Sequence, residues 1–255
     1  MDIKGWLYSS WDNPSKKGQW GLLHILTIVA VVAIIVALAF IFRKRSQKAR
    51  NIVIYVLAGL IFTLEMTRRI VNFTRGDNVT LDDWLWDILP RPWCAISCWL
   101  MILSPFIRKR FWYTFTSISG LICALIFFAY PEAGFNNVYI EFENFYSIAS
   151  HALILISAIT LITLKYTETN PKHIWKSFVF WGVVIVYAMI ESFVLKVEDD
   201  PLYMLPGNDA MEIIGVGYGV YLVLWILFIS IIITSYYMIP YWVNKRKAKK
   251  QLKAA

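Results

Sequence analysis

Seven apolar runs divide the chain, and each has about the length that crosses a lipid bilayer. A spanning helix needs about 20 apolar residues, because its backbone rises about 1.5 Å per residue. The runs cover residues 20–42, 51–74, 86–107, 111–130, 145–165, 176–196 and 214–239. Lipid offers the backbone no hydrogen bonds, so each run must pair its own N–H and C=O groups as a helix. The sequence predicts an all-α polytopic membrane bundle of about seven transmembrane helices.

The composition agrees with a chain whose main solvent is lipid. Of 255 residues, 58% are hydrophobic and 16% are charged, which is too apolar for a soluble domain of this length. No polar stretch is long enough to fold separately, so we interpret residues 1–255 as one transmembrane domain that ends in a basic tail at 240–255. The first twenty residues lack an apolar core, so we do not expect a cleaved signal peptide.

Basic residues occur in alternate loops and predict the orientation. Five lie in RKRSQKAR after the first run, three in IRKR after the third, three after the fifth, and six in the tail. Lys and Arg mark the cytoplasmic side, which places the N-terminus outside and the C-terminus in the cytoplasm. The net charge of +8 therefore reports topology, and no nucleic-acid partner is expected. The other loops hold most of the acids: Asp77, Asp82, Asp83, Glu132, Glu141, Glu143, Glu198, Asp199, Asp200, Asp209 and Glu212.

Five runs carry an ionisable residue at a similar depth below the outer surface. His24, Cys94 and His151 follow the outer ends of their runs by a few residues, and Glu65 and Glu191 precede theirs. The helical rise places all five roughly 6 to 14 Å deep. Charged groups at such depth cost at least a few kcal/mol unless they face a cavity or one another. We therefore expect the five helices to bring these side chains to one pocket.

Helical spacing adds neighbours to this layer. Arg68 and Arg69 follow Glu65 by three and four residues and would share its face. This arrangement suits a structural ion pair and the binding of a lipid phosphate equally well. On the next run, spacings of four, three and four residues place a second set on one face: Asp87, Arg91, Cys94 and Cys98.

Cys94 is the candidate nucleophile. It follows Pro90 and Pro92, so we expect it in the first turn of a helix, where free N–H groups and nearby Arg91 favour a thiolate. His151, at the next outer-facing helix entry, could act as the general base. The alternatives are a small apolar cysteine that only fills space and a structural, hydrogen-bonded histidine.

Motifs for other chemistry do not occur in the sequence. There is no HExxH, CxxC, Walker loop or phosphate-binding glycine fingerprint, so we predict no metal and no cofactor. The glycines before and within the last run, Gly215, Gly217 and Gly219, suit close approach between helices.

Two segments resemble a known family. LPRPWC, which ends in Cys94, and FYSIASHALI, which contains His151, resemble segments of the YwaF-type integral membrane proteins of bacteria, whose vertebrate relative is transmembrane protein 164. His24, Glu65 and the stretch 203–205 also match, and the similarity covers most of the chain.

The resemblance implies a bundle related to the androgen-induced-gene fold and a place in a bacterial cytoplasmic membrane. For the vertebrate member it implies a cysteine-dependent acyltransferase that moves a fatty acyl chain from phosphatidylcholine to a lyso-ether phospholipid. Cys94 would then be the nucleophile and His151 its base. The bacterial motif is L-P-x-H-x-C, and here Pro92 occupies the position of its histidine.

Our leading hypothesis is a phospholipid acyltransferase or lipase that forms an acyl-thioester on Cys94 in the outer leaflet, with a phospholipid or lysophospholipid as substrate. Arg68, Arg69 or Arg91 could bind the lipid phosphate. The alternative is a carrier or binding protein whose polar cavity recognises a small solute or lipid. A third possibility is a scaffold whose ion pairs set helix register. The supporting site residues are His24, Glu65, Arg68, Arg69, Asp87, Arg91 and Glu191.

Overall fold

The computed structural model describes residues 20–75, 93–129, 134–135, 140–195, 202, 204–206 and 209–254, and these residues form helices and no strand. Six described helices are long and apolar enough to cross a membrane, and α5 is a shorter apolar helix. The predicted all-α polytopic bundle is therefore confirmed. The chain divides into two compact units, residues 1–166 and 167–255.

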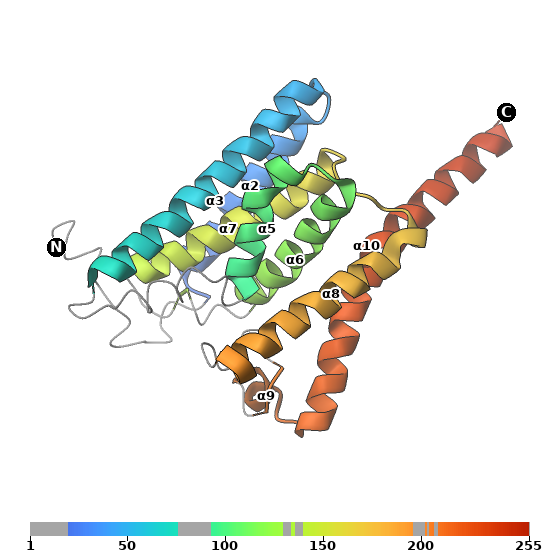
Figure 1. Ribbon diagram of the computed structural model, residues 1–255. Helices are drawn as coiled ribbons and strands as arrows, with labels where there is room; N and C mark the ends of the chain where they lie inside the picture. Colours follow the sequence, from blue (N-terminus) through green and yellow to red (C-terminus); the bar gives the residue numbers. More distant parts are fainter. Residues whose placement is uncertain are drawn as a thin grey trace. The chain divides into compact units, whose positions relative to one another are not determined.

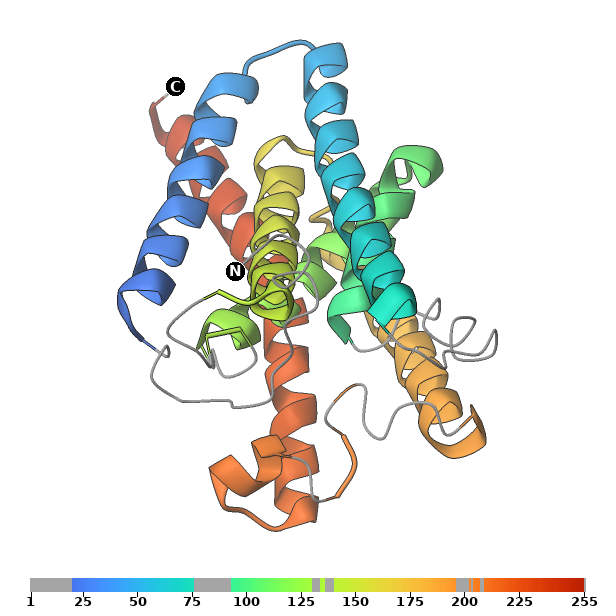
Figure 2. The same ribbon diagram turned by 90° about the vertical axis from the view of Figure 1, so that its left-hand side faces the viewer.

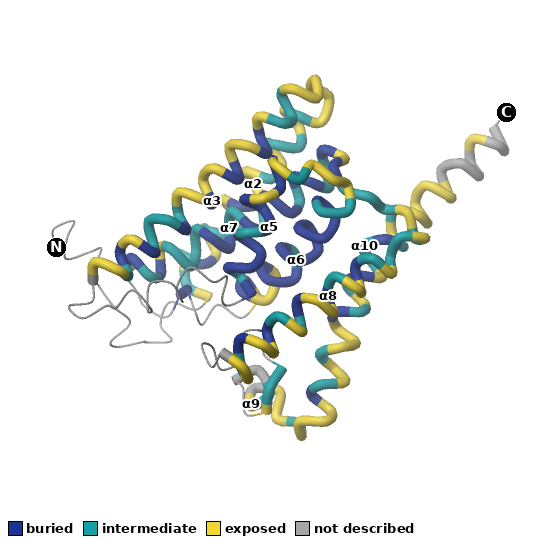
Figure 3. Tube along the Cα trace, viewed as in Figure 1, coloured by how far each residue is buried: buried dark blue, intermediate teal, exposed yellow. Residues whose placement is uncertain are grey.

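The described residues of unit 1 form five helices (Figure 1): α2 (Leu22–Phe42), α3 (Gln47–Arg75), α5 (Trp93–Ile107), α6 (Arg110–Ala129) and α7 (Phe142–Thr163). α7 is central, because it packs against the other four, as the second view also shows (Figure 2). α5 and α6 are mostly buried (Figure 3). α2 leaves apolar side chains such as Ile25, Val29 and Val36 exposed, as a lipid-facing helix does.

Hydroxyl groups and one glycine join the inner helices. Ser97 on α5 hydrogen-bonds Ser119 on α6 at 2.8 Å, and the Ser117 hydroxyl donates to the Ala158 carbonyl on α7 at 2.7 Å. A Cβ on Gly120 would lie 3.0 Å from Cγ2 of Ile154, so the missing side chain lets α6 and α7 approach closely.

Close approach at Gly215, Gly217 and Gly219 is not found. No atom of the described chain lies within 4 Å of the position that a Cβ would take on any of them. Gly215 has a φ of +69°, so its role is to allow the turn between α9 and α10. Within unit 2 these glycines therefore do not bring helices together, and the prediction of tight helix packing at them is not confirmed.

Unit 2 contains α8 (Ile174–Met189), α9 (Asp209–Ile214) and α10 (Tyr218–Ala254). A 3₁₀ turn at Pro171–His173 precedes α8, and a π-helical segment at Ile190–Leu195 follows it. α8 packs against α10, and a buried hydrogen bond of 2.9 Å joins Ser177 to Tyr237. α10 continues as a helix through the residues predicted to form the basic tail.

The helix bounds differ from the predicted spans by a few residues at most ends. α3 begins at Gln47, four residues before the predicted start, because polar residues of the preceding loop already belong to its first turn. The predicted third span began at residue 86, and residues 86–92 lie outside the described part of the chain. α5 is described from Trp93, so Cys94 lies in the first turn of the described helix.

Candidate functional site

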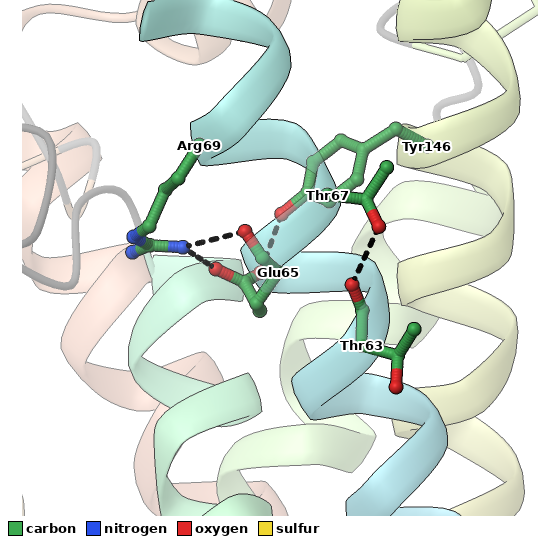
Figure 4. A network of polar contacts seen from close by, with 5 residues as sticks. All are labelled: Thr63, Glu65, Thr67, Arg69 and Tyr146. Atoms are coloured by element: carbon green, nitrogen blue, oxygen red, sulfur yellow. Dashed lines mark hydrogen bonds and ion pairs between the residues drawn. The ribbon is translucent and has the colours of Figure 1, made fainter.

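A buried carboxylate on α3 is the centre of the polar network in unit 1 (Figure 4). The side chain of Glu65 is fully buried, and it forms an ion pair with Arg69 one turn later. Tyr146 reaches across from α7 and donates its hydroxyl to the other carboxylate oxygen. Both oxygens of Glu65 therefore have a donor, which offsets the cost of burying its charge.

Aromatic rings hold the two arginines of this network. The guanidinium carbon of Arg69 lies 5.6 Å from the ring centroid of Trp99 on α5. The guanidinium carbon of Arg68 lies 5.3 Å from the ring centroid of Tyr146 on α7. Cations over aromatic faces are attracted by the ring quadrupole. Charged groups of α3 therefore connect it to both neighbouring helices.

Electrostatic interactions link the thiol of Cys94 to this network. Cys94 is partly exposed and interacts electrostatically with Glu65 and Arg68. Cys98, one turn later on α5, is buried and also interacts with Glu65. The Arg68 cation and the backbone N–H groups of Cys94 and Ala95 favour a thiolate, while burial and the Glu65 carboxylate oppose it.

His151 is held in one tautomer on α7. Its Nδ1 lies 2.7 Å from the Ser147 carbonyl oxygen, and its ring stacks on Phe127 with centroids 3.8 Å apart. Because a carbonyl only accepts, Nδ1 must carry the proton and Nε2 keeps a lone pair that can take another. Among the described residues, no hydrogen bond joins the Cys94 sulfur to His151.

His24 lies in an aromatic cluster with His151. The ring centroid of His24 is 4.4 Å from that of Phe135 and 6.3 Å from that of Phe128. Phe127, on which His151 stacks, contacts both of these phenylalanines. The two histidines therefore belong to one cluster, with phenylalanine rings between them.

The structure brings together only part of the predicted layer. Glu65, Arg68, Arg69 and Cys94 form one polar network, and His24 and His151 lie in the aromatic cluster. Glu191 is buried in the π-helical segment of unit 2, so its place in a shared pocket stays a prediction. Asp87 and Arg91 lie outside the described residues.

Two members of the network were not predicted from the sequence. The Tyr146 hydroxyl donates a hydrogen bond to Glu65, and the Trp99 ring lies against the Arg69 guanidinium. Tyr146 lies only one residue, or about 1.5 Å, into the predicted fifth span, so the depth count that selected the ionisable residues did not include it. Trp99 carries no signal either, because aromatic residues are frequent in all these runs.

Comparison with known proteins identifies a family. The family model described as TMEM164 family matches residues 19–238, a range that includes Glu65, Cys94, His151 and Glu191. No curated protein and no solved structure matches the chain.

Proposed function

Because this chain belongs to the TMEM164 family, we propose that it is a membrane-embedded enzyme that transfers a fatty acyl chain between phospholipids. Cys94 is the proposed nucleophile and His151 its general base. The observation that supports this proposal is the partly exposed Cys94 thiol, which interacts electrostatically with Arg68 and lies on a helix that packs against the one carrying His151.

The proposed reaction has two half-reactions. In the first, the Cys94 sulfur attacks the ester carbonyl of a phospholipid, the C–S bond forms and the C–O bond breaks. The thiol proton passes to Nε2 of His151 and from there to the departing alkoxide, which leaves as a lysophospholipid. In the second, the acceptor hydroxyl gives its proton to Nε2 and attacks the thioester, and the released thiolate takes that proton back.

The surroundings of Cys94 and His151 supply a cation and a base. The Arg68 cation favours the negative thiolate through charge, whereas burial and the Glu65 carboxylate oppose it, and Nε2 of His151 has the lone pair that a base needs. Catalytic hydrogen bonds are often formed only with substrate bound, so transfer requires the thiol and Nε2 to approach each other in the lipid complex. The predicted orientation places this chemistry in the outer leaflet of a bacterial cytoplasmic membrane, near the depth of phospholipid ester groups.

Cysteine variants test the proposal against a matched control. We expect Cys94→Ser to lower acyl transfer from labelled phosphatidylcholine to a lysophospholipid in nanodiscs by about 10³-fold or more, because a serine hydroxyl is a far weaker nucleophile here. Cys98→Ser, one turn further into the same helix, should retain most of the rate. Equal rates for the wild type and Cys94→Ser would overturn the proposal.

The histidine variant extends this test to the base. His151→Gln should slow formation of the Cys94 thioester by about 10²- to 10⁴-fold, the usual contribution of a general base. His24→Gln, in the same aromatic cluster, should have a much smaller effect. Single-turnover detection of the acylated protein by mass spectrometry separates this step from release, and equal losses in the two variants would contradict the assigned role.

A solute carrier is the second candidate, because an acid and a base buried within a span occur in transport pathways. Here Glu65 already pairs with Arg69 and Tyr146, which favours a role in positioning over solute binding. A carrier would lose solute uptake in Glu65→Gln and keep it in Cys94→Ser, the reverse of the pattern expected for acyl transfer.

A further inference from the structure

The other end of unit 1 contains a cavity. It has a volume of about 340 Å³ and lies where α3 and α6 begin and α5 and α7 end. This volume falls in the range of small-molecule sites, roughly 300 to 1,000 Å³. Cys94 and Arg108 are separated by the length of α5, so the cavity lies about 20 Å from Cys94 and its polar network with Glu65, Arg68 and Arg69, which we call the Cys94 network.

The lining of the cavity is strongly positive. It includes Arg108, Arg110 and Lys165, and it contains no carboxylate. Arg108 is fixed, because its Nη2 donates to the Tyr55 hydroxyl and its Nε to the Pro105 carbonyl, each at 2.7 Å. Three cations around one hollow repel each other, and a bound anion would relieve this repulsion.

Two of these cations have an unusual backbone conformation. Arg108 and Lys165 have φ angles of +49° and +64°, in the left-handed region that glycine adopts without strain. Only one other non-glycine residue in the described chain, Trp20, has a positive φ. Both residues lie just after the C-terminal end of a helix, where a left-handed residue is common and glycine is usual. Arginine and lysine are costlier than glycine at such positions, and residues in this conformation are frequent at binding sites.

A hydrogen-bonded frame supports the cavity beside Lys165. The Tyr166 hydroxyl donates to Oδ1 of Asn51 at 2.6 Å, and Nε2 of Gln47 donates to both of these oxygens. Burial raises the pKa of Tyr166 to about 12, so this hydroxyl keeps its proton at neutral pH. No described residue accepts a hydrogen bond from the Asn51 amide nitrogen, which leaves a neutral donor in the lining.

We propose that this cavity binds a phosphate group, carried by a lipid headgroup or by a small soluble compound. Arginine forks, a lysine ammonium and an amide N–H are the donors that bind phosphate oxygens in proteins. The predicted orientation places the cavity at the cytoplasmic headgroups, where anionic lipids are available. The site is separate from the proposed acyl-transfer chemistry and does not depend on it.

Two measurements on the purified full chain distinguish the sources of phosphate. In the first, inorganic phosphate is titrated onto the protein in phosphatidylcholine nanodiscs at constant ionic strength, and binding is followed by calorimetry. In the second, the protein is placed in mixed micelles of phosphatidylcholine and phosphatidic acid, and native mass spectrometry counts the retained phosphatidic acid. Saturable binding in the first indicates a soluble phosphate ligand, and selective retention of phosphatidic acid in the second indicates a lipid headgroup.

Variants at the cavity test its role in binding. Lys165→Gln and Arg110→Gln should each weaken binding by about tenfold, because each removes one charge-assisted hydrogen bond. Lys44→Gln removes a cation from the loop between α2 and α3, outside the cavity lining, and should leave the affinity unchanged.

Lys165→Gly separates binding from folding. It removes the cation and also the strain of the left-handed conformation, so we expect weaker phosphate binding together with a higher unfolding temperature. Absence of saturable binding in both measurements would overturn the proposal. Equal weakening by Lys44→Gln and Lys165→Gln would also overturn it, because diffuse surface charge would then explain the binding.

Discussion

Glu65 and Arg69 are buried one turn apart on α3, and each buried charge needs an opposite charge or hydrogen-bond partners nearby. The ion pair places the two opposite charges together, and Tyr146 supplies the second donor to Glu65. The network connects α3 to α7 through a side chain and also lies beside the Cys94 thiol. Glu65 is therefore well placed to fix the orientation of α3 next to the candidate nucleophile.

Removal of one member of the Glu65–Arg69 ion pair should destabilise the fold more than removal of both. Glu65→Leu leaves Arg69 buried without its counter-charge, so we expect a loss of about 3–5 kcal/mol in the free energy of unfolding. The double variant with Arg69→Met should recover most of this loss, because no uncompensated charge remains. Denaturant unfolding in mild detergent measures both values. A double variant as unstable as Glu65→Leu would show that the pair stabilises the fold by more than mutual neutralisation.

At the scale of the helix, the contact between α6 and α7 depends on a missing side chain at Gly120. In Gly120→Ala the new Cβ would lie 3.0 Å from Ile154 and 3.2 Å from Ala158, so we expect a loss of about 1–3 kcal/mol through overpacking. Gly59→Ala is the matched control on α3, since no described atom lies within 4 Å of its Cβ. The control should gain up to about 1 kcal/mol from better helix propensity. Thermal unfolding of the two variants should therefore shift in opposite directions.

The helices could be predicted from the sequence because lipid allows few alternatives for an apolar run of spanning length. The spacing of Glu65 and Arg69 likewise predicted their common face, since it depends on one helix alone. The contacts of Tyr146 and Trp99 depend on how α5 and α7 are rotated against α3, and a single run does not determine that rotation. The same limit explains why Gly120 was overlooked while Gly215, Gly217 and Gly219 were selected.

At the scale of unit 1, the two ends of the bundle differ in chemistry. One end contains the Cys94 network and the aromatic cluster with both histidines. The other gathers the basic loops that follow α2, α5 and α7, and three of their cations line one cavity. This separation agrees with the occurrence of Lys and Arg in alternate loops of the chain. Because the two ends carry different sites, the orientation in the membrane determines which leaflet each site faces.

Cysteine labelling in intact cells tests the orientation directly. In a Cys94→Ser background the native thiols Cys98 and Cys123 are buried. Ile140→Cys, before α7 at the end of the Cys94 network, should react with a membrane-impermeant maleimide added outside. Lys44→Cys, in the basic loop after α2, should react only after the membrane is permeabilised, because positive loops remain in the cytoplasm. The reverse pattern would place the Cys94 network in the cytoplasmic leaflet, and the donor and acceptor lipids of the proposed transfer would then have to come from that leaflet.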